Sequence, residues 1–262
     1  MASESRAQPY MDKVPELRKK FLDKHYSSEK NYYDSRDISR VKSDDFFVVQ
    51  FLNGKEGNID KAFKIMVEAM KWRKSFGVND LSEKDIPEEV MRAEVSYFYG
   101  RDKKGALLGH ARLRNYNFKG NKALIEGYRK LTIFRLEKVQ REHPGSRISF
   151  VSDLQDHSVS QVDMESNKFN TNVLTVYYPD ILESSFILNY SKIFESLWKV
   201  TKALLGPISK KYIFTTVDEL TQYIDKDQLP VEFGGPSYVY KYTPGEDKIN
   251  ANSNNPGETG SA

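Results

Sequence analysis

The sequence contains no cysteine, and this absence excludes several kinds of functional site. A chain without thiols forms no disulfide scaffold, has no cysteine nucleophile, and holds neither a zinc–thiolate nor an iron–sulfur centre. The absence is typical of a reducing compartment. The length of 262 residues allows either one large domain or two closely packed ones.

Long hydrophobic runs and an excess of one charge are also missing. No apolar run approaches the ~20 residues of a membrane-spanning helix, and residues 1–10 lack the apolar segment of a signal peptide. The 40 Lys and Arg against 37 Asp and Glu leave a net charge of +3, far from the basic surface of a nucleic-acid-binding domain. We therefore expect a soluble, cytoplasmic protein that binds no nucleic acid.

The common catalytic and cofactor motifs are absent as well. The sequence has no dinucleotide-binding glycine pattern, phosphate-binding loop, nucleophile elbow or His-Glu-x-x-His pattern. The four histidines fall in four different predicted elements: His25, His110, His143 and His157. They therefore indicate no metal site. Asp153, Asp156 and His157 follow a predicted strand, where α/β proteins often place functional groups, although an Asp there more simply caps a turn. We expect neither enzyme activity nor a cofactor.

The apolar pattern predicts two lobes followed by a tail. Residues 1–95 repeat apolar side chains at helical spacing, most clearly over residues 60–76, and predict a helical N-terminal lobe. In residues 96–247, β-prone segments alternate with helices, which predicts a mixed, mostly parallel sheet. Residues 248–262 are rich in Asn, Ser and Gly and predict a disordered tail. The expected fold class is α/β.

The β-prone segments carry apolar residues at consecutive positions, as in Phe186-Ile187-Leu188. A sheet with helices on one face and an apolar ligand on the other requires apolar residues on both faces of its strands. A sheet that is covered by protein on both faces requires the same pattern. The periodicity alone therefore leaves both interpretations open.

Five short motifs follow one another in a characteristic order. They are Lys71-Trp72-Arg73-Lys74 at the end of a predicted helix, Gly100-Arg101-Asp102-Lys103-Lys104-Gly105, Val151-Ser152-Asp153-Leu154, Tyr177-Tyr178-Pro179-Asp180, and Leu229-Pro230-Val231-Glu232-Phe233-Gly234-Gly235. Each motif is weak alone, but the ordered set resembles the CRAL-TRIO, or Sec14-like, family of lipid-binding domains.

A finer resemblance concerns one branch of this family. Residues 33–37, 72–74 and 78–81, with Leu205-Gly206-Pro207, look like the CRAL-TRIO region of the motile sperm domain-containing branch. Members of that branch carry a downstream major-sperm-protein domain and a membrane anchor, which this chain lacks. The resemblance implies the isolated lipid-binding part or a short relative, peripheral to membranes. If the chain is part of a longer anchored relative, endoplasmic reticulum contact sites are the expected location.

The family resemblance implies a fold and an activity. The fold is a helical lobe beside a mixed sheet with helices on one face and an apolar lipid pocket closed by a gate helix. The activity is the extraction of a single lipid and its transfer between membranes by a monomer that touches the membrane transiently. The strand residues expected to bind the lipid are Phe98, Leu108, His110, Ile148, Phe150, Ser152, Phe186, Leu188 and Phe214.

Residues 191–205 correspond to the gate helix of the family. The residues expected at the gate and the membrane are Ile193, Phe194, Leu197, Trp198, Val200, Lys202 and Leu204. Their apolar members cover more than half of the helix circumference, which is wider than one buried stripe requires. Trp198 suits an interfacial position because its ring is apolar and its N–H is polar. An ordinary buried helix with solvated lysines is the alternative.

The lipid headgroup is less well specified. In phosphatidylinositol-binding members, a Glu after Tyr-Tyr-Pro and a Lys near the last strand contact the headgroup. The matching positions here are Asp180 and either Lys211 or Tyr212, and a basic segment of the family is replaced by Asn53-Gly54-Lys55-Glu56. Other phospholipids and apolar isoprenoids therefore stay open. Two rival functions also remain: an interaction module whose pocket is filled by Tyr97, Phe98 and Phe150, and an enzyme that uses Asp153, Asp156 or His157.

Overall fold

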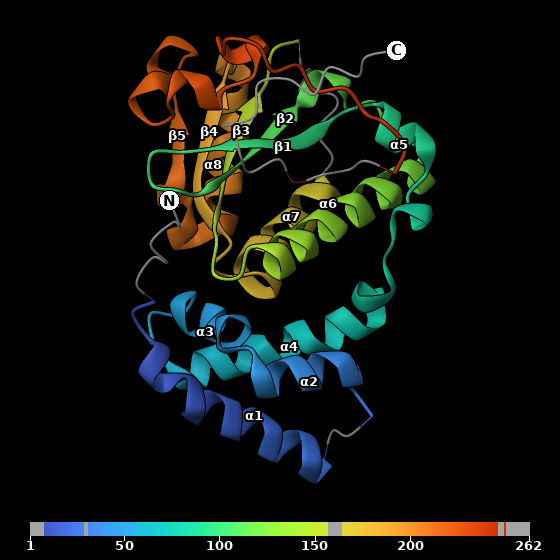
Figure 1. The fold of residues 1–262 in the computed structure, drawn as a ribbon, viewed down its shortest axis with the longest axis vertical. Helices are drawn as coiled ribbons and strands as arrows, with labels where there is room; N and C mark the ends of the chain where they lie inside the picture. Colours follow the sequence, from blue (N-terminus) through green and yellow to red (C-terminus); the bar gives the residue numbers. More distant parts are fainter. Residues whose placement is uncertain (1–7, 29–30, 157–163, 246–248, 250–262) are drawn as a thin grey trace, which may run out of the picture.

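The computed structural model describes residues 8–28, 31–156, 164–245 and 249 and contains two lobes (Figure 1). His157 lies outside the described residues, and so does the predicted tail apart from Ile249.

The first lobe consists of four helices: α1 (Val14–Ser28), α2 (Ser35–Ser43), α3 (Asp45–Asn53) and α4 (Ile59–Phe76). Side chains cap three of them, because Asp34 accepts from the Arg36 N–H, Asp44 from the Phe47 N–H and Asn58 from the Lys61 N–H. Gly77 ends α4 in the left-handed conformation that glycine adopts at little cost. The helices share one buried core, which includes Leu17, Phe21, Val48, Phe51, Met66 and Met70.

The helix α5 (Glu88–Arg92) connects the lobes. Its Val90 and Met91 share a buried cluster with Leu124 and Leu131 of α6 (Lys122–Glu142). The sequence pattern assigns α5 to the first lobe, whereas in the structure it packs on the second. The boundary after residue 95 stays a prediction.

The second lobe is built on five strands: β1 (Ser96–Arg101), β2 (Leu107–Arg112), β3 (Ile148–Asp153), β4 (Leu182–Leu188) and β5 (Tyr212–Phe214). They lie in this order, with β1 antiparallel to β2 and the other pairs parallel. Parallel neighbours need crossovers, which α6, α7 (Met164–Asn172) with the π-helical turn Val173–Tyr177, and α8 (Lys192–Leu205) supply. The predicted α/β class with a mixed, mostly parallel sheet is confirmed.

The two faces of the sheet are covered by different elements. The face that holds Phe150 is lined by α6, α7 and α8. On the opposite face, which we call the back face, Leu108 and Val151 form a cluster with Leu220 and Phe233 from the C-terminal turns. The back face therefore packs against the C-terminal turns, whereas the opposite face is covered by helices.

The hairpin between β1 and β2 explains the glycines of its motif. Gly100 has a φ of 77°, and a Cβ there would lie 2.4 Å from the backbone oxygen of Gln228. Gly105 also has a positive φ, and the Asp102 carboxylate accepts from the Lys104 and Ala106 N–H groups. The turn thus requires glycine at both ends and a short acceptor between them.

A segment that we call the tyrosine strap, residues 236–245, crosses β1. Tyr238 stacks on Tyr99 with ring centroids 3.6 Å apart, and Tyr240 stacks on Tyr97 at 4.4 Å. Beyond them, the Tyr242 N–H donates to Glu94 at 2.7 Å. The strap therefore covers the tyrosine face of the edge strand.

A buried ion-pair network, which we call the seam, joins the lobes. Arg73 of α4 donates from Nε to Asp37 at 3.0 Å and from Nη1 and Nη2 to the Glu137 carboxylate of α6 at 2.5 and 3.0 Å. The Tyr178 hydroxyl also donates to Glu137, at 2.8 Å. Burial raises the pKa of Glu137, but the charge and hydrogen bonds of Arg73 outweigh it and lower this pKa to about 2. The Lys-Trp-Arg-Lys motif thus supplies the arginine that holds the lobes together.

Candidate functional site

A cavity of about 360 Å³ lies between the sheet and the helices α6, α7 and α8. Its sheet wall includes Phe98, Gly109, Phe150, Ser152, Ile187 and Tyr212. Its helical wall includes Tyr128, Leu136, Val173, Leu174, Phe194 and Trp198. Most of these side chains are apolar or aromatic. The volume falls in the range of about 300–1,000 Å³ that is typical of ligand pockets.

Strand alternation decides which residues reach the cavity. Phe150 and Ser152 of β3 line it, whereas Val151 between them points to the back face. Gly109 of β2 pairs with Phe150, and a Cβ there would lie 2.8 Å from the Phe150 ring. The missing side chain at Gly109 therefore leaves the space that this ring occupies in the cavity wall.

Four of the nine strand residues expected to bind lipid line the cavity: Phe98, His110, Phe150 and Ser152. The ring of His110, however, stacks with Tyr97 at 5.0 Å and with Phe233 at 5.6 Å, and its Nε2 lies 3.0 Å from the Tyr99 carbonyl oxygen. Burial lowers the pKa of His110 to about 4, so the ring is neutral at pH 7. The contacts of the His110 ring are therefore mainly with residues of the protein core at the back face, although the residue also lines the cavity.

The other five residues of that set lie outside the cavity lining. Leu108, Phe186 and Leu188 belong to the back-face cluster, because residues of opposite parity face the cavity. On β4 the cavity lining includes Ser185 and Ile187, and also Leu182, which lies beyond a register shift in the pairing of β3 with β4. Ile148 is buried in the cluster beneath α6, and Phe214 packs 5.1 Å from the Trp198 ring. A part for these five in lipid binding stays a prediction.

The helix α8 has apolar side chains on two sides. Phe194 and Trp198 line the cavity, and the Trp198 ring lies 5.0 Å from that of Tyr212. Val200 and Leu204 are 51% and 49% exposed, and Lys202 is exposed as well. The side chains of Ile193 and Leu197 lie outside the described part of the structure. The described part of α8 therefore has apolar side chains both toward the cavity and toward solvent, and its role as a gate stays a prediction.

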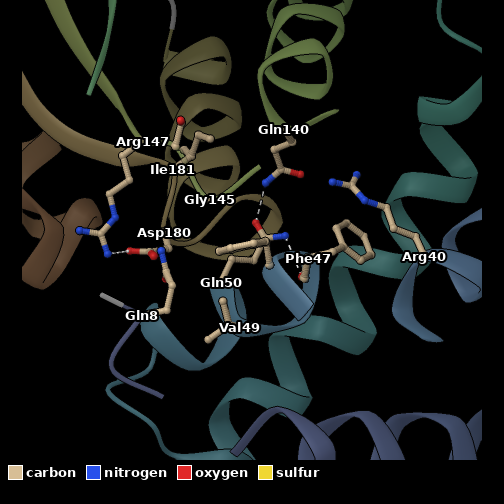
Figure 2. A pocket seen from close by; sticks show the side chains of 12 residues that line it. Gln8, Arg40, Phe47, Val49, Gln50, Gln140, Gly145, Arg147, Asp180 and Ile181 are labelled. Atoms are coloured by element: carbon tan, nitrogen blue, oxygen red, sulfur yellow. Dashed lines mark hydrogen bonds and ion pairs between the residues drawn. The ribbon is translucent and has the colours of Figure 1, made fainter. Parts of the chain in front are cut away.

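The residues expected at the headgroup are used differently. Figure 2 shows Asp180 beside Arg147 where the two lobes meet. Its carboxylate lies 2.5 Å from Arg147 Nη2 and accepts from Asn53 Nδ2 at 2.7 Å. Lys211 donates to the backbone oxygen of Leu182. Tyr212 lines the cavity, and burial raises its pKa to about 12. Asp180 and Lys211 thus have protein partners, and of the three only Tyr212 faces the cavity.

Several polar residues of the cavity wall were missed by the strand-based prediction. They come from the helices and include Arg129, Thr132, Arg135, Asn167, Asn170 and Thr201. Arg135 donates to Ser96 Oγ at 2.9 Å, and Asn167 donates to Thr201 Oγ1 at 3.0 Å. The usable signal was the i, i+3 spacing of Arg129 and Thr132, which places both on one face of α6.

The two acidic residues at the end of β3 differ in their contacts. Asp153 accepts from the Gln155 N–H at 2.9 Å and from Asn189 Nδ2 at 2.8 Å, so it caps a turn. Asp156 is exposed and has a φ of 57°. Within residues 8–28, 31–156 and 164–245, no group of three His, Asp or Glu side chains is arranged to hold a metal ion. In the same part of the chain, no helix combines the length and apolar character needed to cross a membrane.

Comparison with known proteins identifies relatives of this chain. "CRAL-TRIO domain-containing protein C3H8.02" of Schizosaccharomyces pombe is 25% identical over 211 residues, which are 76% of this chain and 47% of that protein. "Phosphatidylinositol transfer protein CSR1" of Eremothecium gossypii is 25% identical over 213 residues, which are 73% of this chain and 47% of that protein. The chain thus spans about half the length of these curated relatives.

A solved structure and a family model agree with these relatives. The crystal structure of Sfh5 matches with a TM-score of 0.63 at 15% identity, covers 86% of this chain and 84% of that chain, and so shows the same fold. A family model described as CRAL/TRIO domain matches residues 91–235, which include the whole sheet and α6, α7 and α8. Because this match covers more than half of the sequence, the chain belongs to the CRAL/TRIO domain family.

Proposed function

We propose that the protein binds a single lipid molecule in the cavity and transfers or presents it between membranes. The observation that carries the proposal is the apolar-lined cavity of about 360 Å³ covered by α8. A relative named as a phosphatidylinositol transfer protein supports a lipid as the ligand.

The helix α8 acts as the gate in this proposal. Phe194 and Trp198 contact the lipid from inside, while the exposed Val200 and Leu204 enter the interfacial region of a membrane. The exposed Lys202 lies on the same helix and pairs with lipid phosphates. Opening of α8 at the membrane surface then admits the lipid to the cavity.

The energetics of acyl chains explain why a cavity suffices. Each buried CH₂ group contributes about 0.8 kcal/mol, so two chains of about 16 carbons hold a lipid in a bilayer by roughly 20 kcal/mol or more. A cavity that replaces this apolar environment makes exchange nearly neutral in free energy. No covalent bond changes, so the proposed activity is not that of an enzyme.

The finer assignments belong to the same proposal. We place the chain in the motile sperm domain-containing branch, and we infer a cytoplasmic monomer that is peripheral to membranes. Asp180 and Lys211 already have partners in the protein, so we assign them to structure and place headgroup recognition elsewhere in the cavity wall.

Mass spectrometry of lipids that co-purify with the protein tests the proposal. We expect about one lipid per protein after gel filtration, with a denatured sample of the same preparation as the control. Protein that is repeatedly free of lipid, even after incubation with vesicles, would contradict the proposal. That result would favour an interaction module with a filled pocket, an alternative that the cavity volume already disfavours.

A further inference from the structure

Arg129 occupies an unusual position on α6. It lines the cavity, and its side chain is only 18% exposed. Its guanidinium carbon lies 5.3 Å from the centre of the Phe169 ring. A positive charge therefore sits in the wall of a largely apolar cavity, where its hydrogen-bonding needs must be met locally.

The protein does not meet those needs. Within the residues that the structure describes, Nε and Nη2 of Arg129 are shielded from solvent and have no hydrogen-bond partner. Two described carboxylates lie near, Glu126 at 3.6 Å from Nη1 and Glu165 at 3.9 Å from Nη2, and these side chains are 47% and 83% exposed. Both distances exceed a hydrogen bond. A buried donor without an acceptor costs free energy, and the cost disappears when an acceptor arrives.

The two unsatisfied donors share one edge of the guanidinium. The Nε–H and one Nη2–H bond are parallel, and this pair matches two oxygen atoms of a phosphate or a carboxylate. A lysine offers no such planar pair. The partner that this edge lacks is therefore a pair of acceptor oxygens, as an oxyanion provides. An apolar chain has no such acceptors.

The surroundings of Arg129 are the polar part of the cavity. Thr132 lies one turn further along α6, and Asn167 and Asn170 line the cavity from α7 with the same i, i+3 spacing. Phe150, Leu136 and Leu174 line it elsewhere. The wall thus combines an apolar part that suits acyl chains with a polar part that suits a charged group.

We propose that Arg129 binds the oxyanion of the cavity's lipid, which makes the ligand a lipid that bears a phosphate or a carboxylate. This inference rests on the proposed function, because it assumes that the cavity holds a lipid. On entry, the oxyanion replaces the long contact of Arg129 Nη2 with Glu165 by a bidentate hydrogen-bonded pair, and the contact of Nη1 with Glu126 is kept. Purely apolar isoprenoids are then poor ligands.

A competition experiment with matched lipids tests the inference. Protein is incubated with vesicles that contain phosphatidic acid, phosphatidylcholine, oleic acid and diacylglycerol in equal amounts, then re-isolated, and its bound lipids are measured by mass spectrometry. We compare wild type with Arg129→Met, Arg129→Lys and the control Arg92→Met, which removes an exposed arginine that pairs with Glu88.

We expect wild type to hold oxyanion-bearing lipids in excess over diacylglycerol. In Arg129→Met this ratio falls tenfold or more, in Arg129→Lys it falls by less, and in Arg92→Met it is unchanged. If only the ratios of the two phospholipids to diacylglycerol fall, the group that Arg129 binds is a phosphate. If only the ratio of oleic acid to diacylglycerol falls, that group is a carboxylate. The ratio of bound lipids does not depend on how much of the protein is folded. If Arg129→Met does not fold, the comparison is made between wild type and Arg129→Lys.

The failures of the two proposals are distinguishable. Wild-type protein without any lipid overturns the proposed function. Wild type and both Arg129 variants with equal lipid ratios overturn the assignment of Arg129 and leave the proposed function intact.

Discussion

The seam and the cavity both bury polar groups under α6, but they treat them in opposite ways. At the seam, Arg73 donates to two carboxylates, and a tyrosine hydroxyl completes the network. In the cavity, Arg129 keeps two donors that have no acceptor within the described residues. All three nitrogens of the Arg73 guanidinium donate within the protein, although one Asp37 oxygen at the seam is buried without a hydrogen-bond partner in the described part of the chain. A guanidinium with a structural role is thus satisfied by the protein, whereas one in a binding site leaves donors to the ligand. The difference distinguishes residues that stabilise the fold from residues whose donors are available to a ligand.

The largest expected effect follows from breaking the seam. Arg73→Met removes the buried cation that contacts both Asp37 and Glu137, and Glu137 keeps longer contacts with Arg40 at 3.6 Å and Arg141 at 3.4 Å. We therefore expect a loss of about 3–5 kcal/mol in the free energy of unfolding. Urea denaturation followed by circular dichroism measures the loss. The exposed Arg92→Met serves as the matched control and should leave the midpoint unchanged. Equal midpoints for both variants would show that the seam contributes nothing to stability.

A smaller effect is expected from filling the cavity. Gly109→Val drives a side chain against the Phe150 ring and pushes that ring into the cavity. We expect a loss of about 1–3 kcal/mol in unfolding free energy and a marked fall in co-purifying lipid. Val151→Ile adds a methylene group to the back face instead and should cost stability without changing the lipid content. If Gly109→Val retains as much lipid as wild type, the cavity is not the lipid site.

The smallest effect on stability is expected at the surface of α8. Val200 is 51% exposed, so Val200→Asp should leave the unfolding free energy unchanged within about 0.5 kcal/mol. Sedimentation with anionic vesicles should nevertheless show several-fold weaker binding, because a carboxylate resists entry into the membrane interface. The control Val239→Asp changes a valine that is 68% exposed and lies outside α8. Equal weakening in both variants would remove α8 from the membrane contact.

Much of the fold was predictable because it depends on local patterns. The helical spacing of α4, the Gly-Asp-Gly turn before β2 and the strand–helix alternation each act within about 20 residues, and the structure contains all of them. The limits of local patterns also appear. The alternation of β-prone segments with helices does not reveal that α7 is followed by π-helical geometry from Val173, or that the turn after β5 is a 3-10 helix, Asp218–Gln222.

The site was less predictable because it depends on which face of a strand points inward. In Phe186-Ile187-Leu188 all three residues are apolar, so the sequence does not reveal that Ile187 alone lines the cavity. A shift by one residue exchanges the faces. The partners of Arg73 lie 36 and 64 residues away, and no local pattern indicates them. By contrast, the breadth of apolar residues on α8 was evident, because a helix shows its whole circumference within four turns.

The tyrosine strap has a consequence for where the domain should be considered to end. The family match stops at residue 235, whereas Tyr238 and Tyr240 stack on the edge strand immediately beyond it. A polypeptide shortened to the family boundary would keep every strand and every crossover helix. It would also expose the tyrosine face of β1, an aromatic patch that favours self-association. The segment that is expected to stay monomeric therefore extends beyond residue 235, where the family match ends.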